Sequence, residues 1–325
     1  MGTRLSIVPP EDYRLGRDVC SYGYFVLWPN HWDVDRRALT RSLELPEGPA
    51  AVGITQPSEI PGGKLTARFD RALARPEQAE AKRQIARMLR LSESADDIAA
   101  FHRVDKRFKK TGHGRLFRSP TLFEDVIKTV TSCNVAWPST VNMNQRLCEV
   151  VGRKTGLDGF PTFPTPAKMA RTRVGTLRAR CRVGYRDQRM VELGKLFAPR
   201  GKKPPELDPE WFEDPANDDE VVFKRLIDLP GIGPYAAGNI MQLLGRYSRL
   251  AIDTETIRHA KNVLGYAGTE RELHKKIEAH YEPFGAHKFR SYWFELWEFY
   301  EQKAGPAETW RRDSVARAFT ASQLK

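Results

Sequence analysis

The chain of 325 residues has few cysteines, no long apolar run and no leader-like beginning. Its four cysteines are scattered at Cys20, Cys133, Cys148 and Cys181, without the CxxC spacing of a zinc or redox site. They also lack the close spacing that holds an iron–sulfur cluster, so we expect reduced, mostly buried thiols. No apolar stretch approaches the roughly 20 residues that cross a bilayer, and residues 1–10 do not resemble a signal peptide. We therefore predict a soluble, intracellular protein with no membrane partner.

Acidic residues are outnumbered, with 41 Asp and Glu against 53 Lys and Arg, which gives a net charge of +12. This excess indicates a polyanionic partner, with nucleic acid as the first expectation. Two segments concentrate the charge. The first basic run, residues 101–118, and the second basic run, residues 171–189, each hold seven basic residues and one acid. Each run could instead be an ordinary solvated surface.

Strand-like patterns are confined to the first part of the chain. Tyr22–Trp28, Ala50–Ile54 and Lys64–Phe69 are rich in β-branched and aromatic residues and are separated by turn residues. Helical spacing begins near Gln78 and continues to the C-terminal region. The pattern predicts a β-rich subdomain with a connecting helix over residues 1–95 and a helical region over 96–325. A proline-rich, acidic insert at residues 199–219 is expected to be a surface loop or mobile linker.

The most informative segment runs from Phe223 to Gly245 and reads as two helices joined by the turn Leu229-Pro-Gly-Ile-Gly233. Pro234 suits the first turn of the second helix, where its missing N–H has no partner to lose. The two glycines leave backbone N–H groups free beside a helix N-terminus, which forms an anion site. A phosphodiester bound there positions the protein without reading a base. The alternative is a tight turn between helices and nothing more.

An acidic residue, Asp253, follows Gly231 by 22 positions, at the predicted start of another helix. Such a residue is commonly an N-cap. A helix N-terminus also keeps a carboxylate ionised, so that a capping role and a chemical role are compatible.

These motifs together resemble the helix-hairpin-helix DNA glycosylases, most closely the 8-oxoguanine and 3-methyladenine DNA glycosylase branches. Further matching segments are Ser119–Asn134, the Phe-Pro segment Phe160–Pro166 and the turn Gly184-Tyr-Arg186. The resemblance covers roughly residues 115–265. It implies an α+β, mainly α fold, in which an N-terminal antiparallel sheet precedes a helical glycosylase domain with its hairpin at residues 227–235. Double-stranded DNA is the implied partner, and we expect a monomer that is cytoplasmic and nucleoid-associated if the source is bacterial.

The resemblance also implies roles for individual residues. Asp253 is the catalytic carboxylate, because a negative charge stabilises the oxocarbenium-like sugar formed when a glycosidic bond breaks. The implied DNA contacts are Leu229, Gly231, Ile232, Gly233, Asn134, Arg186 and His259. The candidates for the base pocket are Tyr22, Tyr24, Trp28, Trp293, Phe294 and Trp297. The backbone carbonyls of Ile227, Leu229 and Ile232 are expected to hold a monovalent cation, K⁺ or Na⁺, and no other cofactor is implied.

One departure from the family pattern bears on the reaction. Relatives that also cut the DNA strand carry a lysine directly after the hairpin, where this chain has Tyr235. A phenol cannot form the imine that such a lysine forms. The sequence therefore predicts a monofunctional glycosylase that excises an oxidised or alkylated purine, with a modified cytosine as a further candidate. The alternative is a non-catalytic DNA-binding protein that has kept the hairpin.

Overall fold

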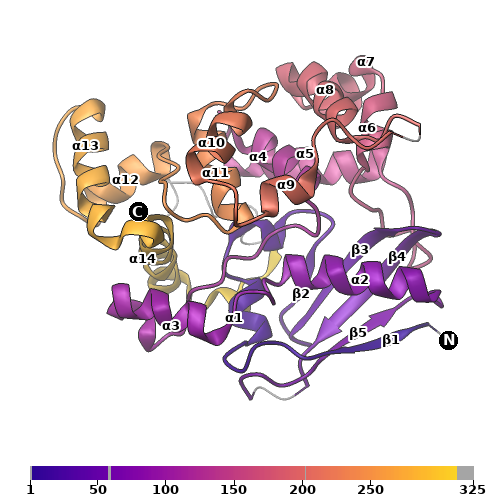
Figure 1. Cartoon of the computed structure of the whole chain (residues 1–325), viewed down its shortest axis with the longest axis horizontal. Coiled ribbons are helices and arrows are strands. Elements are labelled where there is room, and N and C mark those ends of the chain that lie inside the picture. Colours follow the sequence, from indigo (N-terminus) through magenta and orange to yellow (C-terminus); the bar gives the residue numbers. More distant parts are fainter. Residues whose placement is uncertain (1, 58–59, 202, 313–325) are drawn as a thin grey trace.

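The structure, a computed structural model, describes residues 2–57, 60–201 and 203–312 of the chain. Five strands form one antiparallel sheet in the order β1-β5-β4-β3-β2, and helices make up most of the remainder (Figure 1). This arrangement confirms the predicted α+β, mainly α fold class. The strands are β1 (Arg4–Ile7), β2 (His31–Asp33), β3 (Ala38–Leu45), β4 (Gly48–Thr55) and β5 (Leu65–Phe69).

One face of the sheet is built by residues that lie opposite each other on neighbouring strands and therefore point the same way. The buried row that crosses all five strands consists of Leu5, Ala67, Ile54, Leu39 and Trp32. Arg41 of β3 also lies on this face, and its guanidinium contacts the Met88 sulfur at 3.5 Å at the end of α2. Helix α2 lies along the sheet (Figure 1), so that this face looks toward the helical part of the molecule.

The segment Tyr22–Trp28 is not the strand that its composition suggested. It forms a short 3₁₀ helix at Gly23–Val26 instead. Its aromatic side chains are buried against helices far along the chain, and the ring of Tyr22 lies 4.6 Å from that of Trp293. Burial between helices explains the aromatic content, because such residues are as common in a packed interior as in strands.

Fourteen α-helices are present in the described part of the chain, and none combines the length and apolar composition that crossing a bilayer requires. Ser94 caps α3 through a hydrogen bond from the Asp97 N–H. The helices are α1 (Leu15–Val19), α2 (Arg75–Met88), α3 (Ala95–Val104), α4 (Leu122–Ser132), α5 (Trp137–Val151), α6 (Pro166–Arg171), α7 (Val174–Thr176), α8 (Asp187–Phe197), α9 (Pro209–Glu213), α10 (Asp219–Ile227), α11 (Pro234–Leu244), α12 (Thr254–Asn262), α13 (Glu270–Tyr281) and α14 (Lys288–Ala304).

Two hydrophobic cores hold the strands and helices together. The first core contains residues from both sides of the domain boundary expected near residue 95. The first core joins the sheet to residues from the far end of the chain, including Phe289, Trp297 and Trp310. The second core lies within the helices between Leu122 and Leu244. The C-terminal helices therefore share their core with the N-terminal sheet, and the helices in the middle of the chain form a separate body.

Helix α11 is fixed at its C-terminal end by two arginines. Arg90 donates to the Gln242 carbonyl at 2.6 Å, and Arg118 donates to the Leu243 carbonyl at 2.8 Å. Gly245 ends the helix in the left-handed conformation, with φ of 93°. Carbonyls at a helix C-terminus need such partners when they are buried. The hairpin at the opposite end of α11 is thereby held on a rigid support.

The acidic insert is more ordered than a mobile linker. It contains α9, whose Phe212 is fully buried in the second core. Glu213 at the end of α9 pairs with Arg87 of α2 at 2.5 Å. The burial of Phe212 and the ion pair of Glu213 hold this segment against the helices and the sheet. The proline content and charge of the sequence did not indicate these contacts.

A buried charge cluster connects the sheet to α4. Glu124 accepts from Arg41 of β3 at 3.0 Å and forms an ion pair with Lys128 at 2.7 Å, and all three side chains are buried. Burial alone raises the pKa of the Glu124 carboxyl, but Arg41 and Lys128 outweigh it and hold the pKa below its ordinary value. Two cations thus depend on one carboxylate for neutralisation.

We predict that Glu124→Gln strongly destabilises the protein, because it leaves Arg41 and Lys128 buried without a counter-charge. The free energy of unfolding should fall by about 3–5 kcal/mol, measured by urea denaturation at pH 7. The same change at Glu80, which pairs with the exposed Arg83, should cost less than about 1 kcal/mol. If both variants lost the same small free energy of unfolding, the buried cluster would contribute no more to stability than an exposed ion pair.

Candidate active site

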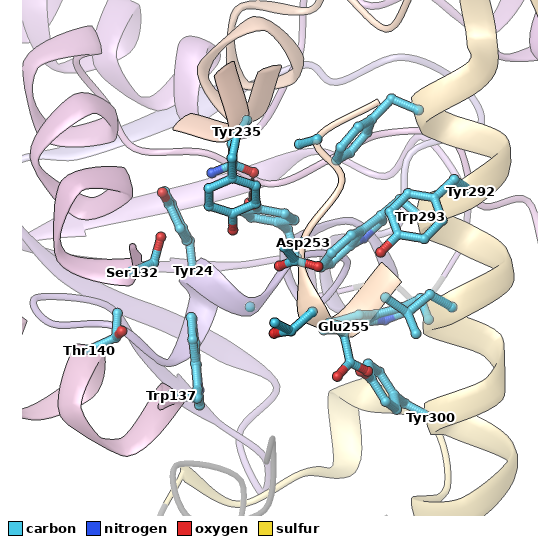
Figure 2. Close-up of a pocket in the computed structure, with 18 of the residues that line it drawn as sticks. Tyr24, Ser132, Trp137, Thr140, Tyr235, Asp253, Glu255, Tyr292, Trp293 and Tyr300 are labelled. Atoms are coloured by element: carbon cyan, nitrogen blue, oxygen red, sulfur yellow. Dashed lines mark hydrogen bonds between the residues drawn. The ribbon is translucent and has the colours of Figure 1, made fainter. Parts of the chain in front are cut away.

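A cavity of about 480 Å³ lies where α4, α5, α11, α12 and α14 approach the 3₁₀ helix at Gly23–Val26. Its volume falls within the roughly 300–1,000 Å³ of small-molecule sites. Figure 2 shows Asp253 between the side chains of α14 on one side and those of α4 and α5 on the other. The lining of this aromatic cavity is rich in tyrosine and tryptophan, and consists of Tyr22, Gly23, Tyr24, Ser132, Val135, Ala136, Trp137, Thr140, Tyr235, Asn239, Ala251, Asp253, Thr254, Glu255, Phe289, Tyr292, Trp293, Leu296, Trp297 and Tyr300.

Helix α14 supplies one wall because its aromatic residues recur at helical spacing. Positions 289, 292, 293, 296, 297 and 300 lie on one side of the helix, and all six line the aromatic cavity. Trp293 and Trp297, both predicted, stack with ring centroids 5.4 Å apart. Phe294, also predicted, points elsewhere and packs on His113 at 5.2 Å.

The tyrosines of the 3₁₀ segment are fixed by hydrogen bonds to neighbouring helices. Tyr22 donates to the Asn239 side-chain oxygen at 2.7 Å, and the Tyr24 hydroxyl lies 2.8 Å from that of Thr129. Burial raises the pKa of the Tyr22 hydroxyl above its ordinary value, so it stays protonated and remains a donor at neutral pH. The structure places both predicted residues in the cavity wall.

Asp253 is the N-cap of α12, and the capping hydrogen bonds to its carboxylate fix the direction in which that carboxylate points. Its Oδ1 accepts from the Thr256 N–H at 2.9 Å and from the Thr256 hydroxyl at 3.0 Å. Tyr292 of α14 lies 2.8 Å from the same hydroxyl. Both Thr256 hydrogen bonds engage Oδ1, and Asp253 forms no ion pair with the described residues. One oxygen is therefore held and the other is left to the cavity.

Burial raises the pKa of the Asp253 carboxyl above its ordinary value, and the hydrogen bonds from Thr256 oppose that rise. Glu255 adds to the rise as a like charge nearby. Glu255 also lines the cavity and accepts from Tyr300 and Arg258. A carboxylate that is partly removed from water interacts more strongly with a positive charge beside it.

The hairpin between α10 and α11 exposes its glycines. Gly231 has φ of 78°, and a Cβ there would lie 2.5 Å from the Arg189 Cδ, so the turn requires glycine. A Cβ at Gly233 would meet no atom within 4 Å. Gly233 is the N-cap of α11 and supplies no side-chain cap. Pro234 has no N–H, and the N–H groups of Tyr235 and Ala236 form no turn hydrogen bond among the described residues, so they are the donors available to an anion at this helix start.

The other predicted hairpin residues point inward. The side chains of Leu229 and Ile232 are buried in the second core, so only their backbone can meet a ligand. The Leu229 carbonyl accepts from the Ile232 N–H at 3.1 Å, whereas the carbonyls of Ile227 and Ile232 accept no turn hydrogen bond among the described residues. These carbonyls fit the expected monovalent cation, which two otherwise unpaired backbone oxygens would favour.

Tyr235 occupies the second position of α11 and lines the aromatic cavity (Figure 2). Burial raises the pKa of its hydroxyl well above the ordinary value, and the negative charge of Asp253 raises it further. The phenol is therefore neutral at physiological pH. No lysine lines the cavity within the described residues.

Asn134 and the Gly184–Arg186 turn meet at the surface. Asn134 has a left-handed backbone, with φ of 52°, and its amide lies 3.4 Å from the Tyr185 hydroxyl. Arg186, predicted as a DNA contact, is buried and donates to the Val130 carbonyl at 3.0 Å and to the Cys133 carbonyl. Its role in the structure is to hold the turn that carries Asn134.

Two further predicted residues lie away from the cavity. Trp28 packs on Phe160, with ring centroids 5.2 Å apart, and does not line the aromatic cavity. His259 is buried, and its Nε2 lies 2.8 Å from a Glu295 oxygen that also accepts from Tyr281. His259 is a link between α12, α13 and α14, because its side chain faces the interior.

Several cavity residues escaped the sequence analysis. Tyr292 and Tyr300 could have been found by extending the helical spacing of Trp293 and Trp297. Trp137 at the start of α5 and Asn239 in α11 carry no such signal. Their contribution depends on how distant segments pack together.

Neither a protein-family model nor a curated protein sequence matches this chain. Solved structures do match it over nearly its whole length. The 3-methyladenine DNA glycosylase from Archaeoglobus fulgidus superposes with a TM-score of 0.70 at 16% identity, covering 91% of this chain and 98% of that one. A Clostridium acetobutylicum 8-oxoguanine glycosylase/lyase gives 0.65 at 18% identity, covering 90% and 97%. MBOgg1 in complex with a low-affinity DNA ligand gives 0.67 at 17% identity, covering 94% and 97%.

The agreement extends across both the sheet and the helices, since each comparison covers at least 90% of this chain. At these identities the comparison establishes architecture. The chain has the fold of the 3-methyladenine and 8-oxoguanine DNA glycosylases, as its hairpin and aspartate predicted.

Proposed function

We propose that this protein is a monofunctional DNA glycosylase, which flips a modified base out of duplex DNA and hydrolyses its N-glycosidic bond. The proposal depends chiefly on Asp253, a capped carboxylate with one oxygen left to an aromatic cavity beside a phosphate-binding hairpin. A protein that only bound DNA would have no use for a partly desolvated carboxylate in such a cavity. The fold shared with solved glycosylases supports the same reaction class.

Binding begins at the backbone of the DNA. The N–H groups at the start of α11 bind a phosphate, without reading sequence. Extruding a nucleotide costs a few kcal/mol, which these contacts and a side chain filling the vacated stack offset. Asn134 and Tyr185, which meet at the surface, fill that gap. The flipped base stacks among the tyrosine and tryptophan rings of the aromatic cavity.

Asp253 performs the chemistry through its charge. As the bond between C1′ and the base nitrogen breaks, the base leaves with the electron pair and the sugar becomes positively charged. The Asp253 carboxylate stabilises that charge, and its partial burial strengthens the effect. A water molecule adds to C1′ and gives its proton to Asp253, which leaves an abasic site. Thr256 is a positioning residue, since it holds the Oδ1 oxygen.

The lining favours one substrate among the oxidised purine, alkylated purine and modified cytosine that the sequence left open. Asp253 is the charged residue of the described lining that forms no ion pair, since Glu255 is paired with Arg258. Aromatic rings also attract cations through their faces. An N-alkylated purine that carries a positive charge satisfies both features better than a neutral oxidised base. No cofactor takes part, apart from a K⁺ or Na⁺ ion at the hairpin carbonyls.

Asp253→Asn should abolish base release and leave DNA binding almost unchanged. Asparagine keeps the oxygen that caps α12 but removes the charge, so single-turnover release should fall by about 10²–10³-fold. The assay measures abasic-site formation on duplexes that each carry one modified base. Asp218, the N-cap of α10, provides the matched control, because Asp218→Asn changes a cap remote from the cavity. Normal base release by the Asp253 variant would refute its role.

Borohydride should fail to trap the wild-type protein on DNA, because no lysine of the described residues lines the cavity. Tyr235→Lys should create a trappable complex, since it puts an amine at the start of α11 beside the reacting sugar. Covalent protein–DNA adducts are counted on denaturing gels, with Tyr235→Phe as the control that introduces no amine. Efficient trapping of the wild type would show that another amine attacks the sugar and that the enzyme is also a lyase.

Gly233→Leu should weaken binding to every duplex alike. The new side chain meets no protein atom within 4 Å at its Cβ and occupies the space of the phosphate. Losing charge-assisted hydrogen bonds worth about 1.5–3 kcal/mol corresponds to about 10- to 100-fold in Kd. Fluorescence anisotropy measures Kd, and thermal unfolding should show a midpoint lowered by only a few degrees, since losing the N-cap glycine costs about 1 kcal/mol. A defect limited to one base sequence would contradict the phosphate-binding role of the hairpin.

A further inference from the structure

The two basic runs have different places in the structure. In the first basic run, the arginines are largely part of the fold. Arg115 pairs with Asp12 at 2.7 Å, Arg118 donates to a buried carbonyl, and Arg107 pairs with Asp105 and Glu295. The residues of this run that stay exposed without an ion pair among the described residues are Arg103, Lys106, Lys109 and Lys110.

The second basic run is largely free. Arg186 is buried and Arg178 pairs with Asp187 at 2.7 Å. The remaining arginines of this run are exposed and form no ion pair with the described residues, and they are Arg171, Arg173, Arg180, Arg182 and Arg189. Guanidinium groups without protein counter-charges recruit mobile anions, and a phosphate backbone displaces these with a gain in entropy.

Side-chain contacts connect part of this run to the hairpin. Arg189 lies against Gly231, where a Cβ would come within 2.5 Å of its Cδ. The Arg189 guanidinium lies over the Tyr185 ring, 5.4 Å from the centroid. Tyr185 is itself 53% exposed and contacts Asn134. A continuous surface therefore leads from the hairpin to the turn that we assign to the vacated base stack.

Arg180 and Arg182 are exposed residues that come shortly before Tyr185 in the chain. Residues Leu177–Cys181 form a π-helical turn, and Arg182 ends it with a left-handed backbone, at φ of 57°. Arg146 of α5 donates to the Arg180 carbonyl at 3.3 Å, which fixes the turn to the body. The turn is thus tied to α5, and the side chains of Arg180 and Arg182 are both exposed.

We propose that Arg180 and Arg182 form a second phosphate-binding surface, which extends the grip on duplex DNA beyond the hairpin and past the Asn134–Tyr185 turn. This inference rests on the proposed function for its ligand. The surface binds the sugar–phosphate backbone of double-stranded DNA independently of sequence, since guanidinium groups at an exposed turn meet phosphate oxygens before base edges. It raises affinity and takes no part in bond cleavage.

The test is the salt dependence of binding to an undamaged 20-base-pair duplex. The Arg180→Gln/Arg182→Gln variant loses two phosphate contacts, which lowers the slope of log K against log salt by about 1.8. Between 50 and 200 mM salt, the variant and the wild type both lose affinity, and the fold-loss of the variant should be about 12 times smaller than that of the wild type. Lys109→Gln/Lys110→Gln removes the same charge from exposed lysines of the first basic run and should keep the wild-type slope. Single-turnover base release at saturating enzyme should be the same in all three proteins.

The outcomes are distinct. A wild-type slope in the arginine variant, or an equal change in the lysine variant, would overturn the proposed surface. A slower rate of base release at saturation would also overturn it, because the surface would then contribute to chemistry. Failure of the glycosylase assignment has a different signature, since the wild type would release no base from any modified duplex while the salt slopes still reported on the surface.

Discussion

The N-terminal cap of α12 is the interaction on which the site depends. Through it, Asp253 is held by the Thr256 N–H and hydroxyl on one oxygen, while the other faces the cavity. An ion pair would have oriented the carboxylate equally well, but it would have cancelled the negative charge on which the proposed reaction depends. The helix terminus compensates for burial with partial charges only, and the carboxylate keeps its full negative charge in a place with little water.

Helix α11 brings binding and chemistry into one rigid element. Its first residues form the hairpin terminus, and Tyr235 and Asn239, within the same 11 residues, line the cavity. Arg90 and Arg118 clamp its far end. A phosphate bound at one end is thereby fixed relative to the cavity wall. In the proposed function, the distance between the bound phosphate and the flipped nucleotide is therefore set by the rise of a single helix rather than by a flexible loop.

Some of this could be predicted from sequence and some could not, for physical reasons. The hairpin and Asp253 follow from local chemistry, because glycine, proline and capping residues act within a few positions of the backbone. Arg186 and His259 lie on the expected elements, yet their side chains point inward, and Trp28 packs outside the cavity. Side-chain direction depends on neighbours that are distant in the chain. For the same reason, the local sequence did not predict the buried partners of the first basic run or the helix α9 in the acidic insert.

The shared core of the sheet and the C-terminal helices has a consequence for biosynthesis. A ribosome releases the five strands long before Phe289 and Trp297, whose burial completes the apolar face beside them. The early strands must therefore wait, with part of their interior uncovered, until almost the entire polypeptide has emerged. The helices between Leu122 and Leu244 have their own core, and they are free to assemble first. The middle of the chain should thus fold first during synthesis, and the N-terminal sheet and the C-terminal helices should pack together last.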